Sequence, residues 1–381
     1  MRRAERVRRA AADAGLDALL VLAPANTYYV SGFQAITYSR PILVVVADHP
    51  ALIVPELEAS HARLRSDIPA IHTYADTALG GSNGSSPFQL AVDSAVEAMR
   101  ALGLRGRRVG FEAAHCSVDG HAYLAQAWGE PLVPVRGLVE RLRMVKDDDE
   151  LQLIRIGCAL AEHGMQIEVA ASVPGTSEVE IMARGNAAML ALAAQRHPAL
   201  HISALSRPVS GEKTALPHAI PSGRRLQRGD VVIHGTGCVV EGYHSEDERT
   251  IFVGQPSDRQ RELFDVMARA QQAAIDAIRP GVPCQEVDRA ARAVIAQAGY
   301  GPQFTHRTGH GIGIDIHEPP FFSPADTTVL QPGMVMSVEP GIYVEGVGGF
   351  RHSDTVVTTA EGCERLTAFP RTLPALVVAS P

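Results

Sequence analysis

Residues 306–320 read HRTGHGIGIDIHEPP, and this stretch decides the fold of the second half of the chain. It places three histidines and a glutamate among glycines and prolines, the residues of tight turns. Stretches of the same character lie on both sides of it, at residues 216–218, 231–237, 243–250, 337–343 and 350–354. Imidazoles and carboxylates on short turns between strands can bind a metal, transfer protons or bind a polar substrate. The sequence therefore predicts a functional site in the second half of the chain.

The first half of the chain alternates helical and strand-like segments. Helices are expected over residues 3–15 and 91–102, and strands over residues 18–22, 41–47, 51–54 and 108–111. This alternation predicts an α/β domain with a largely parallel or mixed sheet.

The second half is predicted to begin near residues 144–149. Its first helix is expected there because the run Lys-Asp-Asp-Asp-Glu puts carboxylates at the positive end of a helix dipole. Further helices are expected over residues 258–278 and 285–298, and strands over 231–234, 250–253, 335–338 and 355–358. The second half is thus predicted to be an α+β domain.

Composition excludes several classes of protein. A chain of 381 residues is too long for one ordinary core, which predicts two domains. The net charge of −7 comes without a long run of one sign, so no nucleic-acid groove is expected. No apolar run approaches the roughly 18 residues of a membrane span. The five cysteines are odd in number and widely spaced, which favours reduced thiols and a cytoplasmic location.

The order and spacing of the motifs resemble the creatinase/prolidase superfamily, which includes aminopeptidase P and has the pita-bread fold of peptidase family M24. The resemblance rests on His-x-x-x-His-Gly-Ile-Gly, His-Glu-Pro-Pro, Glu-Pro-Gly-Ile-Tyr and an Arg-x-x-Asp strand in the second half. In the first half, residues 15–20, 29–33 and 142–146 look like the N-terminal domain of the prolidase and creatinase branch. The resemblance implies a creatinase-like α/β domain over residues 1–143 and an α+β pita-bread catalytic domain over residues 146–381.

The resemblance also implies a metal site, from which this chain departs. Metallopeptidases of the superfamily hold two divalent metals with two Asp, one His and two Glu. This chain keeps His310 and Glu339, has Glu246 in place of an Asp, and has Gly235 and Ser353 where carboxylates are expected.

Two adjacent dications need several carboxylates to offset their charge. A dinuclear site is therefore not expected. A single metal, if bound at all, is expected on Glu246, His310 and Glu339. His234 lies one residue out of register with Gly235 and offers a replacement ligand.

Creatinase provides a second precedent, because it has the same fold and cleaves a C–N bond without metal. The resemblance to it implies that His218 shuttles a proton and that Glu248 and Glu339 orient the substrate, and these three are the expected catalytic residues. The expected substrate-binding residues are His306, His310, His317 and Arg351. The prediction is a metal-independent hydrolase, without a cofactor, that acts on an amide, peptide or guanidino-type bond in a small polar substrate.

Two other functions remain open. The first is a metal-dependent Xaa-Pro dipeptidase (prolidase) that uses one or two Mn, Co or Zn ions. The second is a catalytically inactive pita-bread domain used for binding. The resemblance further implies a homodimer that takes a small-molecule or dipeptide substrate.

Overall fold

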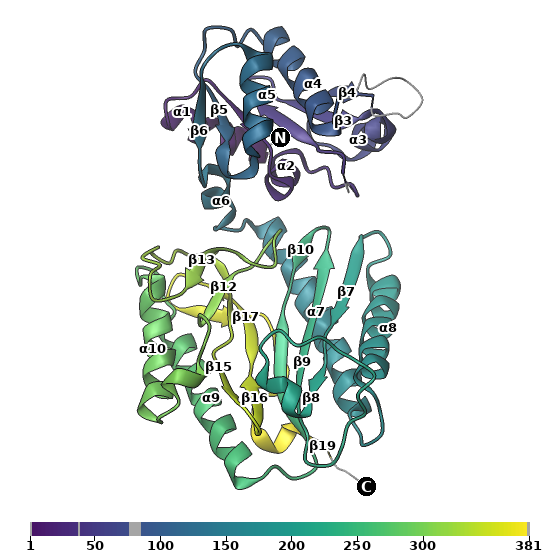
Figure 1. Cartoon of the computed structure of the whole chain (residues 1–381), viewed down its shortest axis with the longest axis vertical. Coiled ribbons are helices and arrows are strands. Elements are labelled where there is room, and N and C mark those ends of the chain that lie inside the picture. The colour runs from purple at the N-terminus through teal and green to yellow at the C-terminus, as the bar shows by residue number, and fades with distance from the viewer. Residues whose placement is uncertain (1, 37–38, 76–84, 379–381) are drawn as a thin grey trace. The chain divides into compact units, whose positions relative to one another are not determined.

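The structure is a computed structural model of the chain and describes residues 2–36, 39–75 and 85–378. The chain divides into two compact units, Met1–Arg143 and Met144–Pro381. Each unit has its own sheet and its own hydrophobic core (Figure 1).

The N-terminal unit is a mixed six-stranded sheet with helices. Its strand order is β4-β3-β2-β1-β5-β6, in which β1 and β5, β5 and β6, and β3 and β4 are parallel pairs. The strands are β1 Ala18–Val21, β2 Leu43–Val46, β3 Ala51–Pro55, β4 Ala70–Tyr74, β5 Val109–Glu112 and β6 Leu132–Val135. The helices are α1 Arg2–Asp13, α2 Pro24–Ser31, α3 Ala59–Arg65, α4 Pro87–Ala101, α5 Val118–Trp128 and α6 Leu138–Arg143.

Helix α4 begins earlier than the apolar periodicity of the sequence predicted. Helix α4 begins at Pro87, not at residue 91, because Ser86 and Gln89 form a capping box. Pro87 occupies the first turn, where its missing N–H costs no hydrogen bond. Helices α2, α3, α5 and α6 were not predicted.

The C-terminal unit is built on an 11-stranded sheet whose main path is β10-β9-β11-β17-β14-β12-β13. These strands are β9 Val231–Val240, β10 Tyr243–His244, β11 Asp247–Val253, β12 Gly309–Gly311, β13 Glu318–Phe322, β14 Val335–Val338 and β17 Ser353–Thr358. Strands β7 Ile202–Ser206, β8 Val209–Ser210, β18 Cys363–Arg365 and β19 Val377–Val378 pair outside this path. A separate hairpin joins β15 Gly341–Val344 and β16 Gly348–Arg351.

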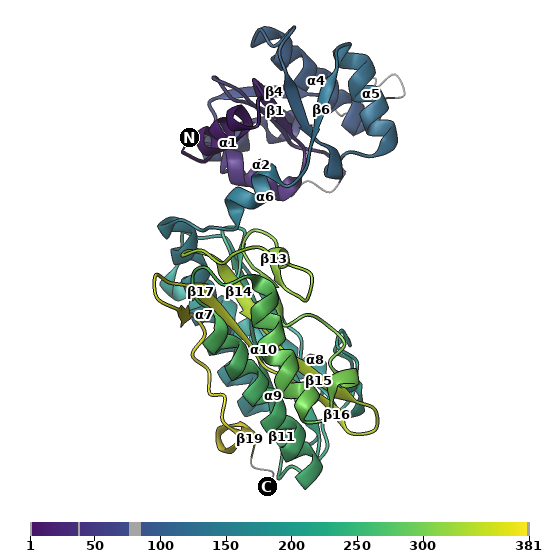
Figure 2. The same ribbon diagram turned by 90° about the vertical axis from the view of Figure 1, so that its left-hand side faces the viewer.

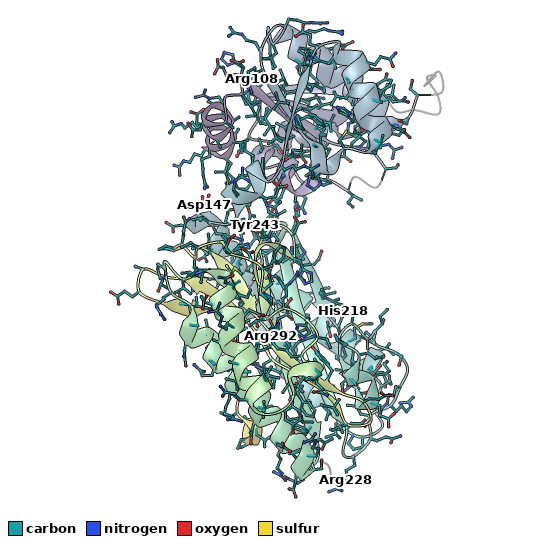
Figure 3. The ribbon with its side chains drawn as sticks, turned by 60° about the vertical axis from the view of Figure 1, so that its left-hand side comes forward. Arg108, Asp147, His218, Arg228, Tyr243 and Arg292 are labelled. Atoms are coloured by element: carbon teal, nitrogen blue, oxygen red, sulfur yellow. The ribbon has the colours of Figure 1, made fainter. Side chains whose placement is uncertain are left out.

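Two pairs of helices belong to this unit. The first pair is α7 Asp148–Ala171 and α8 Glu178–Arg196, and the second is α9 Asp258–Ala277 and α10 Cys284–Gln297. Figures 1 and 2 show α9 and α10 side by side. The predicted start of α7 is confirmed in detail, since Asp147, labelled in Figure 3, forms a capping box with Glu150. Helix α8 was not predicted.

Strand β9 is longer than the predicted strand over residues 231–234. The prediction ended it at Gly235-Thr236-Gly237, which reads as a turn. The strand continues through these residues because β10 and the chain after it pack tightly against them. A Cβ on Gly237 would collide with the carbonyl oxygen of Ser245. Glycine is required here for a close approach of two backbones, not for a turn.

The sheet formed by β9, β11 and β17 has two different faces. Successive residues of a strand point to opposite faces, and cross-strand partners share a face. Arg249 is paired with His234, and Asp247 with Asp354. Glu168 of α7 contacts His234, and Gln271 of α9 contacts Asp354, so we call this side the helix face.

The opposite side of the same strands is the pocket face. Glu248 of β11 is paired with Gly235 of β9 on one side and with Ser353 of β17 on the other. Gly235, Glu248 and Glu246 line the cavity described below, and buried Ser353 donates a hydrogen bond to Glu246.

Candidate active site

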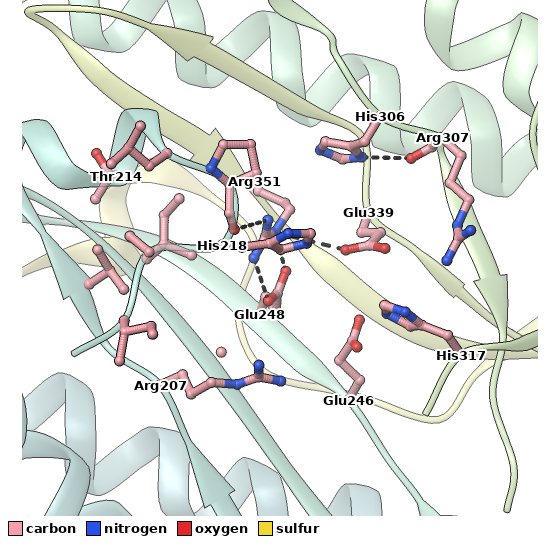
Figure 4. A pocket seen from close by; sticks show the side chains of 17 residues that line it. Arg207, Thr214, His218, Glu246, Glu248, His306, Arg307, His317, Glu339 and Arg351 are labelled. Atoms are coloured by element: carbon pink, nitrogen blue, oxygen red, sulfur yellow. Dashed lines mark hydrogen bonds and ion pairs between the residues drawn. The ribbon is translucent and has the colours of Figure 1, made fainter. Parts of the chain in front are cut away.

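A cavity of about 570 Å³ opens on the pocket face (Figure 4). It brings together residues from β9, β11, β16, the segment before β12 and the loop that follows β8. Of the residues expected at the site, those that line it are His218, Glu246, Glu248, His306, His317, Glu339 and Arg351. His310 is fully buried behind them and contacts Glu339.

His310 presents one ring nitrogen to two carboxylates. Its Nδ1 lies 3.0 Å from the carbonyl oxygen of Gly311, which can only accept a hydrogen bond. In the neutral ring Nδ1 therefore carries the hydrogen and Nε2 has a free lone pair. That Nε2 lies 3.2 Å from Glu339 Oε1 and 3.8 Å from Glu246 Oε2. A lone pair facing two carboxylates requires a proton or a cation between them.

The electrostatics of these three groups are strongly perturbed. Burial, reinforced by the charge of Glu339, raises the pKa of Glu246 to about 7. Burial also acts to raise the pKa of Glu339, but the hydrogen bond and charge of His310 lower it to about 2. Burial acts to lower the pKa of His310, yet the two carboxylates raise it overall. The three side chains thus behave as one coupled cluster of charge.

These donors fit a divalent cation. Glu246, His310 and His317 each offer one ligand atom, and these atoms lie within 4.8 Å of one another. Glu246, Glu248 and Glu339 form a second such group. Carboxylate and imidazole are ordinary ligands of Zn, Mn and Co, and the hydrogen bond from His310 Nδ1 to a carbonyl orients its ring for ligation.

Glu248 is held by Arg351 in a two-fold ion pair. Arg351 Nη2 donates to Glu248 Oε1 at 2.7 Å, and Arg351 Nε donates to Glu248 Oε2. Arg351 Nη1 donates to the Tyr343 hydroxyl at 2.9 Å and to the carbonyl of Pro217 at 3.1 Å. The guanidinium is therefore fixed in one position on the pocket face.

Three histidines of the cavity differ in exposure. His218 is exposed on the loop after β8, and Figure 4 shows it beside the carboxylates. Burial, helped by the neighbouring charge of His310, lowers the pKa of His317 to about 4. Burial also lowers the pKa of His306, whose Nε2 lies 2.9 Å from the Tyr343 hydroxyl. His306 and His317 are therefore neutral rings at neutral pH.

Three further residues shape the site but were not predicted: Arg207, Arg307 and Tyr343. Arg207 and Arg307 line the cavity, and Tyr343 connects His306 to Arg351. Arg307 and Tyr343 lie within the motifs quoted above, so their proximity to the histidines was available as a signal. Arg207 precedes β8 in a stretch without a motif, and nothing in the sequence singled it out.

His234 does not act as a replacement ligand. Its Nδ1 lies 2.9 Å from Glu168 Oε2 and its Nε2 lies 3.0 Å from Ser172 Oγ. Both partners belong to the helix face, because residue 234 points away from the side to which residue 235 points. A bulge that turns His234 into the cavity is absent, since β9 and β11 pair residue for residue from Val231 to Thr236.

The described part of the chain contains no helix with the length and apolar character needed to cross a membrane. All five cysteines are free.

Comparisons with known proteins place both units in one superfamily. The Creatinase/Prolidase N-terminal domain matches residues 3–145, and metallopeptidase family M24 matches residues 152–360. An Xaa-Pro dipeptidase of Pyrococcus furiosus is 32% identical over 94% of this chain and 95% of its own length.

Comparisons with solved structures identify the same superfamily. An Xaa-Pro dipeptidase from Bacillus anthracis superposes with a TM-score of 0.86 at 29% identity, over 99% of both chains. The prolidase from Pyrococcus horikoshii OT3 superposes with a TM-score of 0.83 at 28% identity, over 98% of this chain and all of that one. The predicted superfamily and the two-domain fold are confirmed.

The prediction of metal-independent hydrolysis without a cofactor, in the manner of creatinase, is wrong. The matching family is a metallopeptidase family, and the relatives are Xaa-Pro dipeptidases. The prediction assumed that Gly235 and Ser353 leave the pocket poor in carboxylates. The structure shows that Glu246, His310 and His317 bring one ligand atom each within 4.8 Å of one another, so a cluster able to hold a metal ion persists without carboxylates at these two positions.

Proposed function

Since the chain belongs to metallopeptidase family M24 and is a hydrolase of that family, we propose that it is a metal-dependent Xaa-Pro dipeptidase. The observation that carries this proposal is the cluster in which buried His310 Nε2 faces Glu339 and Glu246 inside a cavity of about 570 Å³. A cavity of this size accommodates a small peptide.

Glu246, His310 and Glu339 are proposed to hold a divalent cation such as Mn, Co or Zn. When bound, the cation would polarise the scissile carbonyl and lower the pKa of water. The sequence predicted His310 as a substrate-binding residue or, if a metal is bound, as one of its ligands, and the proposal adopts the second role.

The remaining histidines are proposed to handle the substrate. His218 stands exposed at the cavity, where it can give a proton to the leaving nitrogen of the dipeptide. His306 and His317 are neutral, so each can donate one hydrogen bond and accept another. This equips them to orient the amide and carboxylate groups of a dipeptide.

A homodimer in the cytoplasm is part of the same proposal. Leu216 and Ile220 flank His218 on its loop and are 62% and 79% exposed, apolar surface that a second subunit would cover. The five free cysteines suit a reducing compartment. Light scattering at micromolar concentration should give twice the chain mass, and a monomer would contradict the dimer.

The test of the function is metal removal followed by assay. The purified chain is dialysed against a chelator and assayed on Xaa-Pro dipeptides and on matched Xaa-Ala dipeptides. Activity on the Xaa-Pro series should disappear and return with Mn²⁺ or Co²⁺. Full activity in a chain freed of metal would refute metal dependence, and no activity in a metal-loaded chain would favour a binding module.

A further inference from the structure

Glu248 occupies the space between two positions that carry no carboxylate. It lies on the middle strand, with Gly235 opposite on β9 and Ser353 opposite on β17. A Cβ built on Gly235 would lie 3.0 Å from Glu248 Oε1. The carboxylate of Glu248 therefore fills the room that a side chain at residue 235 would need.

Both oxygens of Glu248 are already taken by a cation of the chain itself. Arg351 donates to each of them through Nε and Nη2. Tyr343 and Pro217 hold the other terminal nitrogen, and the Arg351 side chain is only 12% exposed. Arg351 Nε also lies 3.9 Å from Glu339 Oε2. The guanidinium thus lies between two of the three carboxylates of the pocket.

One oxygen of Glu246 and one oxygen of Glu339 face His310. Ser353 Oγ donates to Glu246 Oε1 at 2.6 Å, which leaves Glu246 Oε2 facing His310. Glu339 Oε1 faces the same His310 Nε2, a buried atom without a hydrogen-bond partner of good geometry in the described part of the chain. One oxygen from each of two carboxylates therefore faces the same imidazole nitrogen.

The charges of the pocket also favour one bound dication. Three carboxylates line this part of the cavity, and the guanidinium offsets one of them. Glu246 and Glu339 remain as the two carboxylates that face His310, and two carboxylates match the charge of one dication. A second dication beside Glu248 would lie against the fixed guanidinium and be repelled by it.

We propose that this site binds one divalent cation per chain and that the guanidinium of Arg351 replaces a second one. The inference rests on the proposed metal dependence and deepens it. Arg351 is a positioning residue in this account: it neutralises Glu248 and bars that carboxylate from ligation.

The test counts bound metal independently of activity. Mn²⁺ is titrated calorimetrically into the metal-stripped chain, and bound Mn²⁺ is measured by elemental analysis after desalting. The wild type should bind one Mn²⁺ per chain. Two per chain would overturn this inference and leave the proposed function intact, whereas no bound Mn²⁺ would overturn both.

Two variants test whether Arg351 limits the number of bound Mn²⁺ ions. Arg351→Met replaces the aliphatic part of the side chain and removes its charge, which frees Glu248, so bound Mn²⁺ should rise toward two per chain. Arg307→Met is the matched control, because Arg307 lines the same cavity but stacks on Phe321, with its guanidinium carbon 4.3 Å from the ring centroid. Its count should stay at one. A folded Arg351→Met that still binds one Mn²⁺ would overturn the role given to Arg351.

Arg351→Lys covers the case in which the methionine variant fails to fold. Lysine keeps the positive charge but cannot form the two-fold ion pair that the guanidinium makes with Glu248. It should bind one Mn²⁺, as the wild type does. A second Mn²⁺ in Arg351→Lys would show that charge at this position is not what limits the count.

Discussion

Both faces of the sheet formed by β9, β11 and β17 carry an arginine that is paired with carboxylates. On the helix face, Arg249 forms ion pairs with Asp247 at 2.7 Å and Asp354 at 2.8 Å, and all three side chains are fully buried. On the pocket face, Arg351 pairs with Glu248, and both side chains are slightly exposed to the cavity. Each arginine belongs to an ion-pair cluster, yet only the second cluster adjoins a site.

The difference lies in how the arginine donors are satisfied and in which unsatisfied atoms adjoin a cavity. The five N–H groups of Arg249 meet five acceptors: Asp354 Oδ1 and the carbonyls of residues 248, 353, 369 and 370. On the pocket face, His310 Nε2 and one oxygen of Glu246 face each other without a donor between them. Both oxygens of Asp247 on the helix face are buried without a hydrogen-bond partner as well, but they lie beside the Arg249 cation, whereas the unsatisfied atoms of the pocket face adjoin a cavity and are available for a ligand.

The largest loss of stability is expected from Arg249→Met. The substitution leaves Asp247 and Asp354 buried without their cation, and breaking a buried ion pair from one side costs about 3–5 kcal/mol. Denaturant unfolding measures the change. Arg351→Met is the counterpart on the pocket face and should cost about 1–2 kcal/mol, because cavity water can solvate Glu248. Equal losses for the two variants would contradict the contrast between the faces.

A large loss of activity without loss of stability is expected from His218→Ala. General acid–base residues contribute roughly 10²–10⁴-fold to rate, and an exposed histidine contributes little to folding. The turnover number on an Xaa-Pro dipeptide should fall by about this factor while the unfolding midpoint stays unchanged. A parallel fall in both quantities would assign His218 to structure instead of catalysis.

A smaller loss of stability, without loss of metal, is expected from His234→Ala. The variant removes one hydrogen-bond partner each from buried Glu168 and Ser172, which costs about 1–3 kcal/mol. The amount of bound Mn²⁺ should match the wild type. A lower metal content at unchanged stability would place His234 at the metal site after all.

The smallest effect concerns the loop that carries His218. Glu178 is buried and accepts hydrogen bonds from Ser210, Lys213 and Ser222, which fix the two ends of that loop. Burial acts to raise the pKa of Glu178, but these donors lower it overall. A depressed carboxyl pKa contributes stability above its unfolded value of about 4.3, and this contribution is lost as the pH falls through the folded value.

Unfolding curves measured between pH 6 and pH 3 test this prediction. Glu178→Gln should flatten the decline of stability toward acid by on the order of 1 kcal/mol, the net value of one hydrogen bond. Glu212→Gln is the control, because Glu212 lies on the same loop and is exposed. A flattening of equal size in the control would show that the effect does not arise from the loop.

The sequence by itself determined the superfamily, the two-domain fold and the motifs that converge on the cavity. These features are local: capping at Asp147, apolar periodicity in α9 and α10, and polar turns at fixed spacing are properties of short segments. The sequence also identified His310 and Glu339 as residues of one site, and both lie at the cavity cluster.

Only the tertiary structure decided what replaces the carboxylates absent at Gly235 and Ser353. The sequence counted two lost charges and predicted a site without metal. The structure places Glu248 between both positions and pairs it with Arg351, a relation between four strands that spacing along the chain does not encode. The same limit applied to His234, whose direction depends on which face of β9 meets the helices. Strand register and side-chain direction are set by packing between distant segments, and the chemistry of this pocket depends on both.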